Sequence, residues 1–397
     1  MSDIRERLQH WLEIDLDKLT ANLQTVNGWL REQRPDAPPG LIAVVKNDAY
    51  GFGAVPCARA FAEAGAFMLA VTSLEEALEL REAGLTQPVL VFLPPQAAEL
   101  PLFVQYNLTA TLDSLHTAEL LQGWSQLECH LKLNTGMNRF GLEPGEELAA
   151  ALGLLQQPDA PKLCGVYSHL ATALEPEEKF ARLQIERFGQ AKAQVEAAGF
   201  AEASICWHLA NSAASLRYPE AHFSAVRVGS VLYGQLGLAK KKGLSLAEPF
   251  AAKARVAAIR EIAKGAGVGY SQEFVAKKPT RLAVISYGYG DGFGVTASAR
   301  ELTIKDSVQE MSRNVGKLVL GRYQRGVFWQ GRLLPILGRV AMQSMMVDIG
   351  DLSLQVGDVV EAPMRRTAAS CRLPRVYLRQ GQVVEARALL TKSLLKD

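Results

Sequence analysis

The pattern of hydrophobic positions along the chain changes near residue 249. Up to about residue 234, short apolar runs alternate with segments whose apolar residues recur at helical spacing. After about residue 249 this periodicity gives way to short alternating segments between glycines, which is typical of antiparallel strands. We therefore predict two domains, residues 1–248 and 249–397, with the first 12 or so residues as candidates for packing on the second domain.

Eight apolar runs in the first part have the length and β-branched content of buried strands. Helical segments separate most of them, and the longest spans residues 176–199. Eight strand–helix units within ~250 residues indicate a (β/α)8 TIM barrel, followed here by a smaller, mainly β C-terminal domain. An open doubly wound sheet is the alternative, but no glycine-rich phosphate fingerprint follows the first run. The runs are residues 41–45, 67–71, 88–93, 108–112, 128–133, 162–167, 204–209 and 225–233.

Composition narrows the class of protein. The 397 residues are 48% hydrophobic and 21% charged, as in ordinary globular enzymes, and a net charge of +2 gives no reason to expect nucleic acid or an anionic membrane as partner. The charged start of the chain and the absence of a long apolar stretch favour a cytoplasmic protein. The cysteines are scattered without zinc or redox spacing, so no metal is expected: Cys57, Cys129, Cys164, Cys206 and Cys371.

A lysine follows the first strand candidate directly. Lys46 stands between the run at 41–45 and a turn marked by Gly51 and Gly53. Its stem could simply pack while the ammonium reaches water. Alternatively, a partly desolvated lysine loses its proton readily and can form a Schiff base with a carbonyl compound. Tyr50 adds a hydroxyl where the backbone can approach a ligand closely.

Polar side chains also follow several other strand candidates. Active sites of (β/α)8 barrels lie at the carboxyl ends of the strands, so polar residues gathered there indicate a site. Each has an ordinary explanation when taken alone: His169 as a hydrogen-bonded core residue, Arg139 as a surface residue, Ser212 as a helix cap. Chance would have to place the polar groups of six separate segments at one rim, so a shared site is the better explanation. The residues are Lys46, Lys132, Arg139, His169, His208, Asn211, Ser212 and residues 227–230.

The lysine turn and seven further segments resemble successive motifs of the alanine racemase family. Their order along the chain and their places at the ends of the predicted strands agree with that family. The matching segments are VVKNDAYGFG (44–53), HLKLNTGMNRFG (130–141), GVYSHLATA (165–173), HLANSAAS (208–215), VRVGSVLYG (226–234), VGYSQEF (268–274), YGYGDGF (287–293) and GRVAMQSMMVDIG (338–350).

The resemblance implies a barrel that binds pyridoxal 5′-phosphate (PLP), followed by a β domain, in a head-to-tail homodimer. It implies that Lys46 binds PLP covalently and serves as one of two bases, because racemisation removes a proton from one face of Cα and returns one on the other. Tyr270 matches the second base and would come from the partner subunit's β domain. His169 and Arg227 match the hydrogen-bonded chain that favours the deprotonated form of that tyrosine.

The resemblance also assigns residues to the cofactor and the substrate. Arg227 would meet the pyridine nitrogen of PLP, while Arg139 and the backbone amide of Met342 would hold the substrate carboxylate. Lys132 and Tyr289 match supporting residues, and many members of the family carry that lysine as a carbamate that braces the arginine. The residues implied for the PLP phosphate are Tyr50, Ser212, Gly229 and Ser230.

The implied reaction interconverts L-alanine and D-alanine, a precursor of peptidoglycan. The chain departs from the family at Phe52, where histidine is usual, at Gln343, where aspartate is usual, and after Asp358, where a shortened segment lacks a tyrosine that narrows the substrate entrance. A racemase of a larger or more polar amino acid, such as serine, lysine or ornithine, or one of broad specificity, is the alternative. Tyr270 and Arg227 argue against a non-catalytic PLP-binding barrel, and Arg227 against a PLP decarboxylase.

Overall fold

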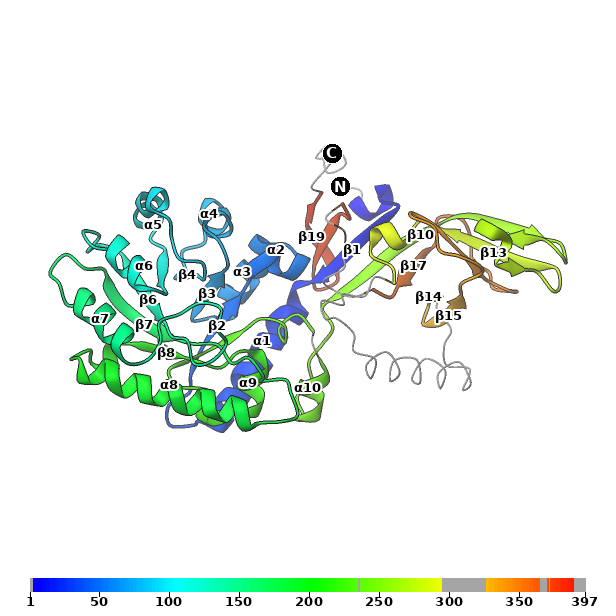
Figure 1. Cartoon of the computed structure of the whole chain (residues 1–397). Coiled ribbons are helices and arrows are strands. Elements are labelled where there is room, and N and C mark those ends of the chain that lie inside the picture. Colours follow the sequence, from blue (N-terminus) through cyan, green and yellow to red (C-terminus); the bar gives the residue numbers. More distant parts are fainter. Residues whose placement is uncertain (1–2, 235, 295–325, 365–369, 371, 389–397) are drawn as a thin grey trace. The chain divides into compact units, whose positions relative to one another are not determined.

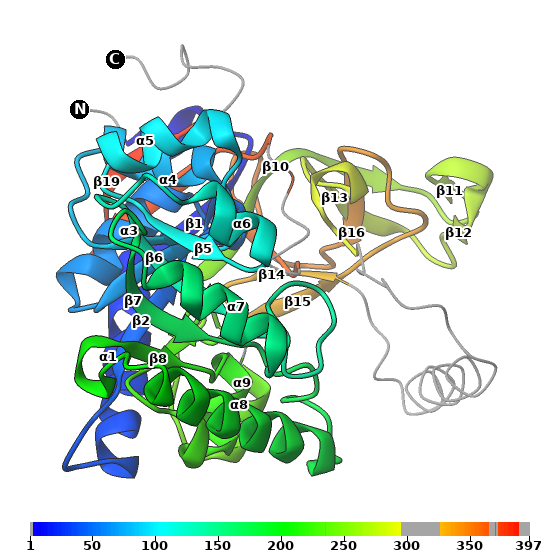
Figure 2. The ribbon, with the colours of Figure 1, turned by 60° about the vertical axis from the view of Figure 1, so that its left-hand side comes forward.

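The computed structural model describes residues 3–234, 236–294, 326–364, 370 and 372–388. The chain divides into two compact units, residues 16–249 and residues 1–15 together with 250–397. In the first unit, eight strands form a closed barrel in which every neighbouring pair is parallel, and helices surround it (Figure 1, Figure 2). The expected (β/α)8 barrel is confirmed.

The barrel unit follows the alternation that the apolar runs predict. Its strands are β2 (Gly40–Val44), β3 (Met68–Val71), β4 (Val89–Val91), β5 (Thr109–Leu112), β6 (Glu128–Lys132), β7 (Lys162–Tyr167), β8 (Cys206–His208) and β9 (Ala225–Val228). Its helices are α1 (Leu16–Gln33), α2 (Lys46–Gly51), α3 (Ala54–Glu63), α4 (Leu74–Glu82), α5 (Leu100–Gln105), α6 (Leu115–Leu120), α7 (Glu146–Leu155), α8 (Lys179–Ala197), α9 (Ser212–Arg217) and α10 (Leu236–Lys241).

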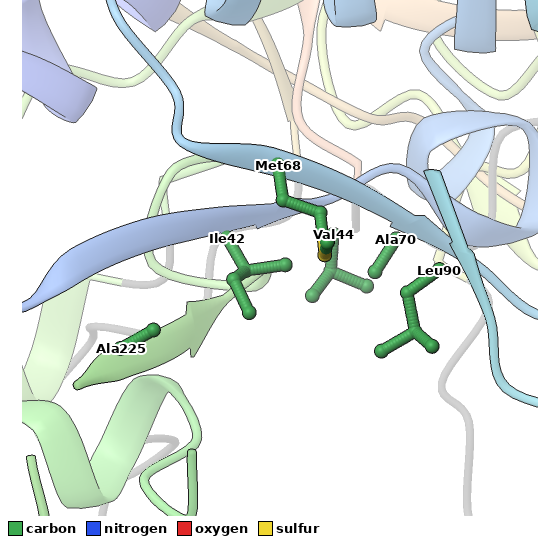
Figure 3. Packing of buried hydrophobic residues seen from close by; sticks show 6 residues of the cluster. All are labelled: Ile42, Val44, Met68, Ala70, Leu90 and Ala225. Atoms are coloured by element: carbon green, nitrogen blue, oxygen red, sulfur yellow. The ribbon is translucent and has the colours of Figure 1, made fainter. Parts of the chain in front are cut away.

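The barrel strands are apolar along nearly their whole length because side chains on both of their faces are covered. Every residue of β3, β4, β5 and β9 is buried, as expected of parallel strands enclosed by helices. One cluster from four neighbouring strands is shown in Figure 3, and the partly buried rings of Tyr50 and Phe92 pack against it. Its members are Ile42, Val44, Met68, Ala70, Leu90 and Ala225.

The last barrel strand is shorter than the apolar run that predicted it. The run spans residues 225–233, whereas β9 ends at Val228. The amide of Gly229 donates to the Ser212 hydroxyl at 2.9 Å, and Leu232 N donates to Gly229 O at 2.8 Å and closes a turn. The prediction of strand over residues 229–233 was therefore wrong, and the turn lies at the end of the barrel that carries the polar residues.

The second unit is built on a nine-stranded sheet, mostly antiparallel, with a separate two-stranded sheet of β11 and β12. The smaller, mainly β C-terminal domain expected from the sequence is confirmed. Its strands are β1 (His10–Asp15), β10 (Phe250–Ile262), β11 (Gly267–Val268), β12 (Phe274–Val275), β13 (Thr280–Ile285), β14 (Gly326–Trp329), β15 (Arg332–Pro335), β16 (Met345–Asp348), β17 (Val359–Ala362), β18 (Arg375–Arg379) and β19 (Gln382–Arg387).

The first strand of the chain lies in the middle of this second sheet. β1 pairs antiparallel with β10 and parallel with β18, although more than 200 residues separate them in the sequence. Trp11 and Leu8 pack with Val376 in a buried cluster, so the N-terminal residues form part of the core of this unit. The shortened segment after Asp358 also belongs here, and its residues 365–369 and 371 lie outside the described part.

Candidate active site

A cavity of about 580 Å³ opens at the carboxyl ends of the barrel strands, where the rim residues were expected to gather. It is lined by residues from seven of the eight strand ends or the loops that follow them. The cavity brings together ten of the residues singled out in the sequence: Lys46, Tyr50, Lys132, Arg139, His169, Asn211, Ser212, Arg227, Gly229 and Ser230.

Lys46 begins a turn of left-handed helix. Residues 47–50 all have φ between 51° and 59° and ψ between 30° and 54°, and none of the four is glycine. Each L-residue in this conformation costs about 1–2 kcal/mol relative to the right-handed form. Asp48 supports the turn, because its carbonyl accepts from Gly53 N at 2.9 Å and its Oδ1 accepts from Ala54 N at 2.9 Å. Backbone held in so costly a conformation is typical of functional sites.

The environment of Lys46 favours its neutral amine. Burial lowers the pKa of Lys46, and the positive charge of Arg139 lowers it further, while Glu76 acts in the opposite direction. A deprotonated amine is the form that attacks a carbonyl compound. Of the two interpretations drawn from the sequence, the partly desolvated, reactive lysine agrees better with this geometry than the surface lysine.

Positive charge dominates the cavity. Lys46, Lys132, Arg139 and Arg227 line it, and Glu175 is the only acidic side chain among its described lining residues. Burial and the charges of Arg227 and Arg139 lower the pKa of Lys132 to about 8. The Lys132 ammonium also lies 5.2 Å from the ring centres of Phe140 and Tyr167. Such a cavity suits a ligand that carries negative charge.

Arg227 is the most deeply placed of these cations, with 4% of its surface exposed. Its Nη2 donates to the carbonyl of Ser168 at 2.5 Å and its Nη1 to that of His208 at 2.7 Å. The rings of His208 and His169 accept from it at 2.9 and 3.3 Å. Among the described residues no carboxylate pairs with it. The buried guanidinium is therefore held by neutral acceptors, and its charge is left to act on the cavity.

The hydrogen bonds of Arg227 fix the protonation of a histidine chain behind it. Arginine only donates, so His208 Nδ1 must accept, and the proton of His208 lies on Nε2. That nitrogen is 2.9 Å from His130 Nδ1, which must accept in turn. Burial and the charge of Arg227 lower the pKa of His130 to about 3 and hold the pKa of His208 and His169 well below the ordinary value. All three rings are thus neutral at pH 7.

Ser212 has a different role from the helix cap that its position suggested. Asn211 caps α9 instead, because its Oδ1 accepts from Ala213 N and Ala214 N, each at 3.1 Å. The Ser212 hydroxyl accepts from Gly229 N and keeps its own proton for another acceptor. A Cβ on Gly229 would lie 2.2 Å from the Tyr50 hydroxyl, so only glycine leaves room here.

Three of the predicted residues lie in the second unit. Tyr270, Met342 and Tyr289 are large side chains with 67%, 59% and 50% of their surface exposed. The loops of the last two are neighbours, because Gly290 N donates to Met342 O at 2.9 Å and Tyr289 N to Ala341 O at 3.2 Å. These exposed side chains stand on a separate compact unit, and the roles expected of them stay predictions.

Two buried residues of the barrel were missed as site residues. His130 ends the histidine chain, and Tyr167 stacks on His208 with ring centres 4.9 Å apart and an interplanar angle of 7°. A Cβ on Gly165 would meet the His130 ring at 2.6 Å, so this glycine makes room for it. The available signal was a histidine between the apolar residues of a predicted strand and a glycine on the next strand.

The described residues contain no group of three His, Cys, Asp or Glu side chains that could hold a metal ion. No helix among them is long and apolar enough to cross a membrane.

Residues 14–236 match the family model of the alanine racemase N-terminal domain, and residues 250–370 match that of the C-terminal domain. The chain belongs to the alanine racemase family. It is therefore related to enzymes of the isomerase class. The two matches together cover every lining residue of the cavity except Gly237 and Leu238, and also cover Tyr270, Tyr289 and Met342.

Individual alanine racemases resemble the chain along most of its length. The enzyme of a Synechocystis species is 36% identical over 366 residues, which cover 90% of this chain and 89% of the relative. The enzyme of a Nostoc species is 34% identical over 360 residues, covering 88% and 85%. A crystal structure of the alanine racemase from Bacillus anthracis, with bound L-Ala-P, has a TM-score of 0.77 at 28% identity and covers 96% of this chain and 98% of its own.

The depressed pKa of Lys132 gives a testable pH dependence. Below pH 8 the folded protein must hold a buried ammonium, and this cost disappears as the pH rises from about 8 toward the ordinary value of 10.5. We compare the change in the free energy of unfolding that Lys132→Met causes at two pH values. We expect this change to favour the variant more at pH 7 than at pH 9.5, by on the order of 1–2 kcal/mol. Urea unfolding of cofactor-free wild type and variant, in buffers purged of carbon dioxide, measures the difference.

Lys179→Met is the matched control, because Lys179 begins α8 at an exposed position away from the cavity. An effect of Lys132→Met that is the same at both pH values, or larger at pH 9.5, would show that Lys132 does not carry a buried charge at neutral pH.

Proposed function

We propose that the protein is a PLP-dependent racemase that interconverts L-alanine and D-alanine, with Lys46 and Tyr270 as its two bases. The observation that carries the proposal is the setting of Lys46: a partly buried amine with a lowered pKa, at the start of a left-handed turn, in a cavity rich in positive charge. The relatives named alanine racemase, and the L-Ala-P bound in the Bacillus anthracis structure, support the same reaction and substrate here.

The groups around the cavity suit PLP. A lysine with a lowered pKa suits its aldehyde, and hydroxyl and amide groups near cations suit its phosphate. The Ser212 hydroxyl accepts from Gly229 N and so can donate to a phosphate oxygen, as can the Tyr50 hydroxyl beside Gly229 and the amide of Ser230. When bound, PLP withdraws electrons from the amino acid attached to it and makes the Cα proton easier to remove.

We assign Arg227 to the ring nitrogen of PLP. Its guanidinium lines the cavity, and the carbonyls and histidine rings behind it fix its orientation. Burial lowers the pKa of Arg227 only to about 10, so it keeps its proton at pH 7 and can only donate. A ring nitrogen that accepted from such a donor would stay unprotonated. Arg227 would thereby limit how far the cofactor stabilises negative charge at Cα, and would favour prompt return of a proton.

The remaining residues bind the substrate and move its proton. Arg139 holds the substrate carboxylate, with Lys132 supporting it and the amide of the partner subunit's Met342 donating to it. Lys46 accepts or returns the proton on one face of Cα, and Tyr270 does so on the other. Tyr289 supports that side of the site. Tyr270, Met342 and Tyr289 act in the partner subunit's cavity, within a head-to-tail homodimer. Their large exposed fractions are in keeping with side chains that become covered on assembly.

The proposal includes the setting of the enzyme. We place the homodimer in the cytoplasm, where it supplies D-alanine for peptidoglycan precursors. The unpaired thiols of Cys129, Cys164 and Cys206 are in keeping with a reducing compartment.

The substrate assignment is tested by incubating the pure enzyme with single L-amino acids and resolving the enantiomers by chiral chromatography. We expect the highest kcat/KM for L-alanine. Because a pocket rejects an added hydroxyl group poorly, L-serine should follow within ~100-fold. A higher kcat/KM for L-lysine or L-ornithine would favour the alternative of a racemase for larger amino acids, and no racemisation of any amino acid would contradict the proposed function.

The role of Tyr270 is tested by Tyr270→Phe, which keeps the ring and removes the proton carrier. We expect kcat to fall by ~10²-fold or more, the usual contribution of a general base. The two directions of the reaction should be impaired at different steps, because each base serves one enantiomer. Tyr106→Phe, at the end of α5 and outside the cavity lining, is the control and should keep wild-type kcat.

Mixing two inactive variants tests whether Tyr270 acts across subunits. Lys46→Ala and Tyr270→Phe, mixed equally and allowed to exchange subunits, should regain about a quarter of wild-type activity, because half of the dimers would be hybrids with one intact site of two. If Tyr270 serves the cavity of its own chain, every hybrid site lacks one base and the mixture stays inactive.

A further inference from the structure

One carboxylate joins the lysine turn to the neighbouring strand–helix loop. Glu76 lies in the first turn of α4, and its Oε2 accepts from Thr72 N at 2.7 Å and Ser73 N at 3.3 Å. Its Oε1 accepts from the backbone N of Asn47, the residue after Lys46. A capping-box glutamate ordinarily bonds only the start of its own helix. This one also reaches the loop after a different strand.

The hydrogen bond from Asn47 N to Glu76 Oε1 holds the first residue of the left-handed turn from outside that turn. Asn47 is the first of the four left-handed residues, and the fold gives its amide the Glu76 oxygen as acceptor. The direction of the chain at residues 46 and 47 sets where the Lys46 side chain leaves the backbone. Asn47 is itself exposed, so packing of its side chain does little to hold this conformation. Thr72, bonded to the other carboxylate oxygen, lines the same cavity as Lys46.

We propose that Glu76 is a positioning residue for Lys46. Its carboxylate ties the left-handed turn to the start of α4 and thereby holds the lysine in its place at the cavity. The inference rests on the proposed function, in which Lys46 carries PLP. A glutamine cannot replace the carboxylate, because one of its two amide positions would turn an N–H group toward the N–H of Asn47 or toward those of Thr72 and Ser73.

A role limited to capping α4 makes a different prediction. Loss of the cap would loosen the start of α4 and leave the lysine turn unchanged. Glu75 separates the two cases, because it lies in the same first turn of α4, is exposed, and has the same charge. Glu75→Gln therefore removes the same charge from the start of the helix without touching residue 47.

The test uses the full chain freed of PLP by dialysis against hydroxylamine, and PLP as the probe. We expect Glu76→Gln to weaken PLP binding by ~10-fold or more, as for loss of hydrogen bonds to a charged group. Amide hydrogen exchange over residues 46–51 should become faster by a similar factor without PLP. Glu75→Gln should leave both measurements within about twofold of wild type.

A second substitution distinguishes the effect of Glu76 on the conformation of the turn from the effect of its negative charge. Glycine adopts positive φ readily, so Asn47→Gly should hold the turn without Glu76, and Glu76→Gln combined with Asn47→Gly should recover most of the PLP affinity. If Glu76→Gln alone does not fold, this double variant must fold and bind PLP. A double variant that stays weak or unfolded, wild-type exchange and affinity in Glu76→Gln, or an equal effect of Glu75→Gln would each overturn the proposal.

The experiment distinguishes failure of the proposed function from failure of the positioning role of Glu76. If the wild-type chain binds no PLP, that function fails, whereas the exchange rates of residues 46–51 still decide whether Glu76 holds the turn.

Discussion

The site depends on a positive charge that the barrel buries without a carboxylate partner among the described residues. Arg227 is nearly inaccessible, and three backbone carbonyls and two neutral histidine rings accept its hydrogen bonds. Desolvating a guanidinium in this way is costly, and the well-aligned acceptors offset only part of that cost. Burial lowers the pKa of Lys46, Lys132 and His169, and the uncompensated charge of Arg227 lowers each of them further. The charge that favours an anionic ligand therefore adds to the burial that favours a neutral amine at Lys46.

The lysine turn adds a second constraint, which is geometric. Four consecutive left-handed residues are tolerated because bonds from outside the turn hold them, from Gly53 and Ala54 to Asp48 and from Asn47 to Glu76. Charge and geometry thus converge on one amine. The exposed residues of the second unit complete the proposed chemistry, since racemisation needs a base on each face of Cα.

Much of this arrangement was accessible from the sequence. The barrel follows from eight apolar runs, and the rim residues follow from the rule that barrel sites lie at the carboxyl ends of strands. Strand β1 was not predicted, because its partners at residues 250–254 and 375–378 are far away in the chain and local periodicity carries no information about them. The left-handed turn was hidden because residues 47–50 contain no glycine. The position of Ser212 at the start of a helix suggested a cap, but Asn211 accepts the helix amides instead. The sequence does not show that His130 is linked to Arg227 through His208, because the three residues lie on different strands.

The central claim is that Lys46 is the residue that binds the cofactor. Reduction of the purified enzyme with borohydride makes a lysine–PLP bond permanent, and mass spectrometry of a peptide digest then locates it. We predict that the mass added by reduced PLP appears on the peptide containing Lys46 and disappears in Lys46→Ala. Labelling of Lys132 or of another lysine, or no labelling of protein that racemises alanine, would contradict this account.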